Sequence, residues 1–171
     1  MFDRLGETMP IVLLGFMGVG KTTVARLLPL PVYDMDRIIE EQIGMSIVDY
    51  FDHEGEVAFR QRETQVLQEL LNLPEDCLVS TGGGVIKSEV NRKLLVANRE
   101  NNILLTASFE VAYKRICLDK ESERPLFLQL SKEEVKAIYM ERISLYQGVA
   151  NTIINTDHLS PEQVARNILC R

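Results

Sequence analysis

The chain has 171 residues, a mass of 19.5 kDa, a formal charge of −6 and a pI near 5.0. This length and a mixture of 46% hydrophobic and 26% charged residues predict a globular protein with one domain spanning residues 1–171. The acidic balance argues against a nucleic-acid-binding protein, and no apolar run reaches the roughly 18 residues that a membrane span needs.

The three cysteines are widely spaced and flanked by apolar residues. We therefore expect Cys77, Cys117 and Cys170 to be reduced thiols in the core rather than disulfides or zinc ligands. Residues 1–10 lack the apolar segment of a signal peptide. Together these features predict a cytoplasmic protein.

Residues 15–22 read G-F-M-G-V-G-K-T, the full G-x-x-x-x-G-K-[ST] pattern of a phosphate-binding loop. The pattern follows the apolar run 11–14, which suits a buried strand, and precedes residues 23–28, which suit a helix. Glycines let the loop turn tightly and point backbone N–H groups at phosphate oxygens, and the helix N-terminus adds its dipole. Lys21 is expected to reach the β and γ phosphates, and the Thr22 hydroxyl to bind Mg²⁺. The predicted nucleoside triphosphate site comprises Gly18, Val19, Gly20, Lys21, Thr22 and Thr23.

Beyond this loop, short apolar runs alternate with segments of helical periodicity. The helix that begins at Lys21 should be short, because Pro29 cannot continue it. Further strands are predicted at residues 32–33, 77–80, 103–105 and 153–154. Helices are predicted at residues 37–43, from Ser46, and at 56–73, 88–97, 108–117, 131–146 and from 160. This alternation predicts an α/β fold in which helices cover both faces of a parallel sheet.

Residues 119–131 interrupt the alternation with charged side chains around Arg124 and Pro125. A polar segment without periodicity between two helices is typical of a connecting loop. We therefore predict a mobile lid here.

The residues after the phosphate-binding loop narrow the class of protein. A regulatory GTPase would need a guanine-reading N-K-x-D sequence, and the chain has none. Instead, Asp34-Met35-Asp36 ends the second predicted strand, at the sheet edge where that strand meets the loop. The two carboxylates of D-x-D are expected to alternate across the strand end, so one could face a metal ion and the other an acceptor substrate. A solvated turn would give the same sequence.

Several motifs, in this order, together resemble the shikimate kinase family. They are the loop at 15–23, D-M-D at 34–36, G-M-S-I at 44–47, F-D-H-E-G-E-V-A-F-R-Q-R-E at 51–63, S-T-G-G-G at 80–84 and R-P-L at 124–126. The resemblance runs from about residue 11 to the C-terminus. It implies a three-layer P-loop kinase fold with a five-stranded parallel sheet and a mobile lid, similar to nucleoside monophosphate kinases. It also implies transfer of the ATP γ-phosphoryl group to the 3-hydroxyl of shikimate, on the route to chorismate and the aromatic amino acids.

The resemblance assigns the residues that would bind shikimate. Arg60 and Arg142 match arginines that bind the carboxylate, and a planar guanidinium suits that geometry. Asp36 matches the residue that holds the acceptor hydroxyls and draws off the proton. Glu63 lies one helical turn from Arg60 and could orient it. The loop residues that let the substrate approach the backbone are Gly82, Gly83 and Gly84. Without this context, each arginine would be interpreted as a solvated helix charge and the glycines as a plain loop.

The same resemblance assigns the nucleotide and metal residues. Asp34 would support Mg²⁺ together with Thr22, with ATP as the co-substrate. Arg124 in the lid would cover the transferring phosphoryl group beside Lys21. Arg115 would pack on adenine, although a cation at a helix C-terminus is an equal alternative. Catalysis is thus predicted to depend on Lys21, Asp36 and Arg124.

Two departures from the family pattern affect these expectations. The segment between Lys21 and Asp34 is shorter than usual, and Ser144 stands where the family commonly has proline. Two alternatives are a related small-metabolite kinase, such as gluconate kinase, and an ATP-binding module that is regulatory or inactive. A monomer is expected from the family, with no nucleic-acid or membrane partner.

Overall fold

Five parallel strands form the centre of the molecule, a computed structural model that describes residues 9–119 and 130–171. The strands are β1 (Ile11–Leu14), β2 (Val32–Asp34), β3 (Leu78–Ser80), β4 (Asn102–Thr106) and β5 (Thr152–Asn155), in the sheet order β2-β3-β1-β4-β5. This confirms the predicted α/β class and the number of strands. β1 lies at the centre of this order, and its side chains are therefore buried on both faces of the sheet.

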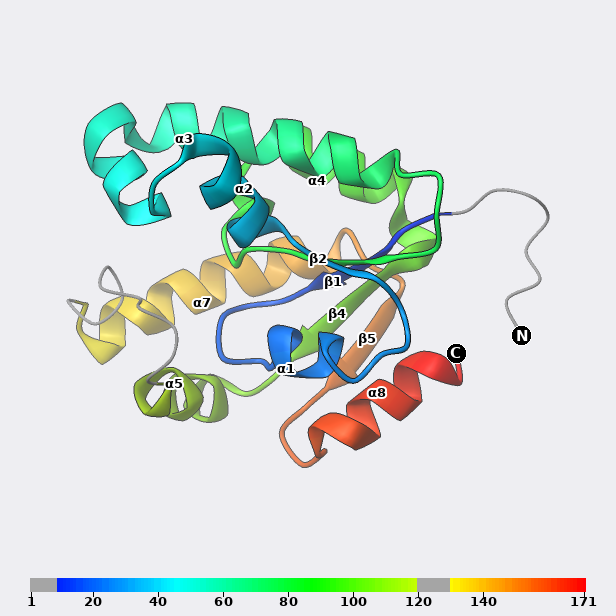
Figure 1. Ribbon diagram of the computed structural model, residues 1–171. Helices are drawn as coiled ribbons and strands as arrows, with labels where there is room; N and C mark the ends of the chain where they lie inside the picture. The colour runs from blue at the N-terminus through cyan, green and yellow to red at the C-terminus, as the bar shows by residue number, and fades with distance from the viewer. Residues whose placement is uncertain (1–8, 120–129) are drawn as a thin grey trace.

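Helices cover both faces of the sheet. The helices are α1 (Lys21–Ala25), α2 (Met35–Ile43), α3 (Ile47–Leu71), α4 (Glu89–Ala97), α5 (Phe109–Leu118), α7 (Lys132–Gln147) and α8 (Pro161–Leu169). Figure 1 shows α2, α3 and α4 above the sheet and α1, α5 and α8 below it. Alternate residues of β1 serve the two layers: Leu13 packs with the α1, α5 and α8 side, and Leu14 with the α2, α3 and α4 side.

The local signals for helix ends are largely confirmed. α7 and α8 begin at the predicted serines, Ser131 and Ser160, each of which forms a capping box, and Gly44 ends α2 with a φ of 73°. The helices predicted from Ser46 and from residue 56 are the two parts of α3. The helix is interrupted between them at Gly55, where φ is 81° and ψ is 171°.

Other boundaries differ from the predictions. The first helix begins at Lys21, as predicted, but ends at Ala25, before Pro29, and the N–H groups of Leu27 and Leu28 donate three residues back rather than four. The short 3-10 helices η1 (Val85–Lys87) and η2 (Arg99–Asn101) were not predicted, since three-residue turns carry no periodic pattern. The predicted lid, with Arg124, lies almost wholly outside the described residues.

The cysteine prediction is half right. All three cysteines are free thiols, but only Cys77 is buried, whereas Cys117 and Cys170 are exposed near the ends of α5 and α8. Beside them in the sequence, Ile116 and Ile168 face the core, whereas Leu118 and Leu169 are exposed. In the parts of the chain that the structure describes, no helix combines the length and apolar character needed to cross a membrane.

Candidate active site

The register of the sheet brings three loops to one edge. Asp34 at the end of β2 is in register with Ser80 at the end of β3, and Ser80 with Leu13 of β1. The carboxyl ends of β1, β2 and β3 therefore meet, and the phosphate-binding loop, the D-M-D sequence and the glycine loop leave the sheet side by side. Thr81 strengthens this junction, because its hydroxyl donates to Leu13 O at 2.9 Å.

The phosphate-binding loop is packed tightly at two of its glycines. A Cβ at Gly15 would lie 2.4 Å from Leu105 O, and one at Gly18, where φ is 76°, would lie 2.4 Å from Ala112 O. A Cβ at Gly20 would meet nothing within 4 Å. The loop thus rests against β4 and α5 on one side and is open at Gly20, where α1 begins.

Lys21 folds back over this loop. Its ammonium group donates to Gly15 O at 2.7 Å and to Phe16 O at 3.1 Å. Thr22 and Thr23 follow in the first turn of α1 and are exposed. The loop, the cation and the two hydroxyls therefore share one place, as the motif predicts.

Arg115 lies beside the loop, at the last turn of α5. Its guanidinium donates to Thr156 Oγ1 and to Thr156 O, both at 2.9 Å, and to Gly18 O at 3.4 Å. Thr156 is buried, and its hydroxyl lies 3.3 Å from Val19 O. Sequence reasoning missed Thr156, since a single threonine after a strand carries no signal of its own.

The two aspartates of D-M-D have different environments. Asp34 is the N-cap of α2, and its Oδ1 accepts from the backbone N–H groups of Asp36 and Arg37 at 3.1 and 3.3 Å. Asp36 lies in the first turn of α2, so the pair spans a strand-to-helix junction rather than a strand end. This corrects the expectation that the two side chains alternate across a strand.

Asp36 contacts the glycine loop closely. A Cβ at Gly82 would lie 2.5 Å from Asp36 Oδ1, so any larger residue there would displace the Asp36 carboxyl group. Asp36 is exposed as a whole residue, but its carboxyl group is packed against this loop. Burial and then the negative charges of Asp34 and Glu63 raise the pKa of Asp36 to about 6, against the opposing charge of Lys21.

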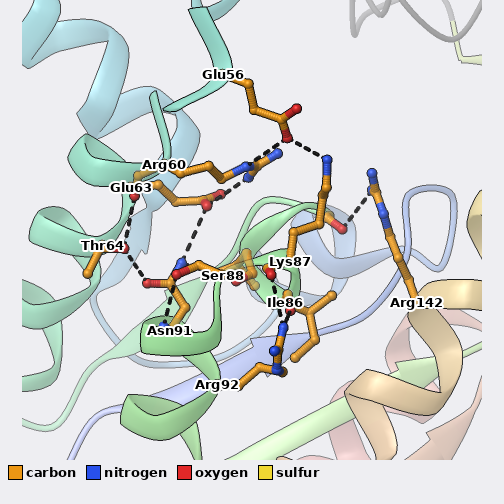
Figure 2. Close-up of polar contacts among 12 residues, drawn as sticks. Glu56, Arg60, Glu63, Thr64, Ile86, Lys87, Ser88, Asn91, Arg92 and Arg142 are labelled. Carbon is orange, nitrogen blue, oxygen red and sulfur yellow. Dashed lines mark hydrogen bonds and ion pairs between the residues drawn. The ribbon is translucent and has the colours of Figure 1, made fainter. Parts of the chain in front are cut away.

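Arg60, on α3, is held by carboxylates and stacked on aromatic rings. Its Nη1 donates to Glu63 Oε2 at 2.7 Å, and its Nε to Glu56 Oε1 at 3.3 Å (Figure 2). The guanidinium also lies 5.1 Å from the centre of the Phe59 ring and 5.9 Å from that of Phe51. The predicted pairing of Glu63 with Arg60 is thus present in the structure.

Behind this pair lies a buried polar network that the sequence did not reveal. Glu63 is 1% exposed, and burial raises the pKa of its carboxyl group despite the opposing charge of Arg60. Asn91 of α4 is fully buried and donates through Nδ2 to Glu63 Oε2 at 3.4 Å and to Val85 O at 3.1 Å (Figure 2). Thr64 Oγ1 lies 2.6 Å from Asn91 Oδ1. Through Glu63 and Asn91, the network connects Arg60 to α4 and to the backbone of η1.

Arg142, on α7, approaches the glycine loop from the opposite side. Its Nη1 donates to Gly83 O at 2.9 Å, and the guanidinium lies 5.9 Å from the centre of the Phe16 ring. Tyr146, one helical turn later and fully buried, donates to the same carbonyl at 2.8 Å. The side chain of Arg142 is thus held against the glycine loop in this chain, in which Ser144 replaces the expected proline.

The glycine loop is where these groups converge. A Cβ at Gly84 would lie 2.7 Å from both Nη1 and Nη2 of Arg60, and one at Gly83 would lie 3.5 Å from the backbone N of Met17. The structure thus brings Asp36, Arg60 and Arg142 around three glycines and beside the phosphate-binding loop. An open groove of about 630 Å³ adjoins Arg60 between α3 and the start of α4, but neither aspartate lines it.

Thr22 and Asp34 are the residues that could hold a magnesium ion. Among the described residues no cluster of three or more histidine, cysteine or acidic side chains could hold a metal by itself. Thr22 and Asp34 supply the hard oxygen atoms that Mg²⁺ prefers, and the cap bonds of Asp34 both go to Oδ1. These residues fit an ion that takes its other ligands from phosphate and water.

Comparison with known proteins gives the same family. The profile of the shikimate kinase family matches residues 17–171. The chain is 72% identical to a shikimate kinase of Streptococcus suis over 95% of its own length and 100% of that protein, and 54% identical to one of Streptococcus thermophilus over 95% and 99%. A solved shikimate kinase from Acinetobacter baumannii, in complex with shikimate, has a TM-score of 0.83 at 34% identity, covering 95% of this chain and 91% of that one. The chain belongs to the shikimate kinase family.

Proposed function

We propose that this protein transfers the γ-phosphoryl group of ATP to the 3-hydroxyl of shikimate, giving shikimate 3-phosphate and ADP, on the route to chorismate and the aromatic amino acids. Membership of the family supports the reaction, and the A. baumannii relative supports the substrate because it is in complex with shikimate. The observation that carries the proposal is the packing of Asp36, Arg60 and Arg142 around the glycine loop beside the phosphate-binding loop.

The acceptor site follows from the chemistry of shikimate, a small carboxylated polyol. Arg60 and Arg142 bind its carboxylate, since guanidinium groups pair with carboxylates through two parallel hydrogen bonds. Gly82, Gly83 and Gly84 let the ring approach the backbone. Asp36 accepts hydrogen bonds from the hydroxyls and takes the proton of the attacking oxygen, for which a pKa of about 6 suits it at neutral pH.

The donor site is the phosphate-binding loop with its flanking residues. Gly18, Val19 and Gly20 offer backbone N–H groups to the phosphates, Lys21 neutralises charge on the β and γ groups, and Thr22 and Thr23 add hydroxyls. Arg115, fixed by Thr156, packs on adenine. Arg124, outside the described residues, joins Lys21 at the transferring group when the lid closes over the site.

Thr22 and Asp34 would hold Mg²⁺, Asp34 through water. The ion supplies neutralisation of the charge that develops on the phosphate oxygens during transfer. The protein contributes chiefly position and charge, because phosphoryl transfer needs little covalent chemistry.

We also place the protein in the cytoplasm as a monomer with one domain over residues 1–171. The family profile, which runs unbroken over residues 17–171, supports the single domain. Light scattering of the purified protein tests the monomer.

The substrate is tested by ADP release with Mg²⁺ and ATP, run in parallel with shikimate, gluconate and nucleoside monophosphates. Turnover with shikimate alone is expected. Turnover with gluconate would favour the related sugar-acid kinase, and ATP binding without any turnover would favour the regulatory module.

The carboxylate site is tested by Arg60→Ala. Loss of the guanidinium should raise the KM for shikimate by about a hundredfold, since a charged hydrogen bond is worth about 1.5–3 kcal/mol and is lost together with its partner's orientation. The KM for ATP should not change. Arg62→Ala is the matched control, because Arg62 lies on the same helix and its guanidinium donates to exposed Gln65. Normal shikimate binding by Arg60→Ala would show that the carboxylate binds elsewhere.

A further inference from the structure

One carboxylate oxygen is shared by two cations at the edge of the acceptor site. Glu56 follows the break of α3 at Gly55, and its Oε1 accepts from Lys87 and also, at 3.3 Å, from Nε of Arg60. Figure 2 shows Glu56 above the cluster, with one contact to each cation. Lys87 and Arg60 therefore compete for the same oxygen of Glu56.

This arrangement matters because Glu56 can compete with a carboxylate ligand for the guanidinium of Arg60. Within residues 9–119 and 130–171, the guanidinium of Arg60 makes its hydrogen bonds through Nη1 to buried Glu63 and through Nε to Glu56. Nη2 remains for a ligand. Glu63 is fixed by burial, but the Glu56 side chain is 47% exposed and can move. A mobile carboxylate beside Arg60 could form the same two-bonded pair that a substrate carboxylate would form.

Lys87 is in a position to prevent this. It ends η1, directly after the glycine loop, and its backbone N–H donates to Gly84 O at 2.9 Å. The backbone of Lys87 is therefore anchored to the same loop that packs against Arg60. Lys87 is also the main cause of the lowered pKa of Glu56, ahead of Arg60.

We propose that Lys87 is a positioning residue for shikimate binding, which holds Glu56 away from full pairing with Arg60 and so keeps the guanidinium available to the substrate carboxylate. The proposal rests on the role proposed for Arg60. It gives Lys87 an effect on the substrate through Glu56, without requiring contact between Lys87 and the substrate.

The experiment compares Lys87→Met with Lys87→Arg, Glu56→Gln and the double variant Lys87→Met/Glu56→Gln in steady-state kinetics. Lys87→Met should raise the KM for shikimate about fivefold, since a partly exposed ion pair is worth at most about that factor, while kcat and the KM for ATP stay within about twofold. Lys87→Arg keeps the positive charge, so its KM for shikimate should equal that of the unmodified protein. The double variant should return to within about twofold of Glu56→Gln, because the rival charge is gone.

Lys93→Met is the matched control. It removes the same charge from an exposed ion pair with Glu89 on α4, and its KM for shikimate should equal that of the unmodified protein. An unchanged KM in Lys87→Met would overturn the proposal, as would a double variant whose KM stays as high as that of Lys87→Met, which would show a direct contact with the substrate. Arg60→Ala distinguishes a failure of the role proposed for Lys87 from a failure of the role proposed for Arg60. If Arg60→Ala raises the KM for shikimate and Lys87→Met does not, the carboxylate site is supported and the role of Lys87 is wrong.

Discussion

Among individual residues, Asp36 is the proposed acceptor of the proton, and folding raises its pKa. Its raised pKa of about 6 means that the carboxyl group is protonated below that pH and can accept the proton of the substrate hydroxyl only above it. We expect kcat/KM for shikimate to rise as the pH increases through about 6 and to level off above it. Asp36→Asn should lower kcat/KM by about 10²–10⁴ and abolish this rise.

The neighbouring aspartate gives a sharper test of the cause. Of the negative charges that raise the pKa of Asp36, Asp34 has the largest effect, and asparagine caps a helix as well as aspartate does. Asp34→Asn should therefore move the rise in kcat/KM to lower pH, whatever it does to the maximum rate. A profile that stays in place would assign the ionisation to another group.

At the scale of elements, the phosphate-binding loop is braced by α5. Gly18 and Gly20 both have positive φ, but only at Gly18 would a Cβ meet backbone, at Ala112 O. Gly20→Ala should lower the free energy of unfolding by about 1 kcal/mol from backbone strain alone. Gly18→Ala should lower it by about 1–3 kcal/mol more, because α5 has to move. Urea unfolding without ligands measures both values, and equal losses would mean that the loop is not braced.

The sequence predicted elements well where their signals are local. The capping boxes of α7 and α8 each lie within four residues, and the break in α3 falls on a glycine, so Ser131, Ser160 and Gly55 could all be recognised. The early end of α1 at Ala25 and the turn η1 were missed, because they depend on how the segments after α1 and β3 pack.

At the scale of the whole molecule, motifs identified the loops of the site but not the network that supports them. Each of Asp36, Arg60 and Gly82 stands in a recognisable stretch of sequence. The contacts of Glu56 with Lys87 and of Glu63 with Asn91 join residues 31 and 28 positions apart. Such pairs arise only when the turn η1 and α4 pack on α3, and a single sequence gives no sign of them.

Cys77 can report on the stability of the whole fold. It is 1% exposed, its carbonyl accepts from Ile11 N at the start of β1, and burial raises the pKa of its thiol to about 11. A disulfide reagent should therefore label exposed Cys117 and Cys170 quickly and Cys77 only when the sheet opens. Saturating shikimate and ATP at about a hundred times their dissociation constants should slow the labelling of Cys77 at least a hundredfold, because both bind only the folded chain.

The double variant Cys117→Ser/Cys170→Ser isolates this slow reaction, and Cys77→Ala should abolish it while leaving the two fast thiols. The labelling rate of Cys77 should also rise with urea in step with global unfolding, since β3 lies between β1 and β2 and cannot separate without breaking the sheet. Fast labelling of Cys77 that is insensitive to both substrates would instead show that the end of the sheet near Cys77 opens locally, independently of the site at the opposite edge.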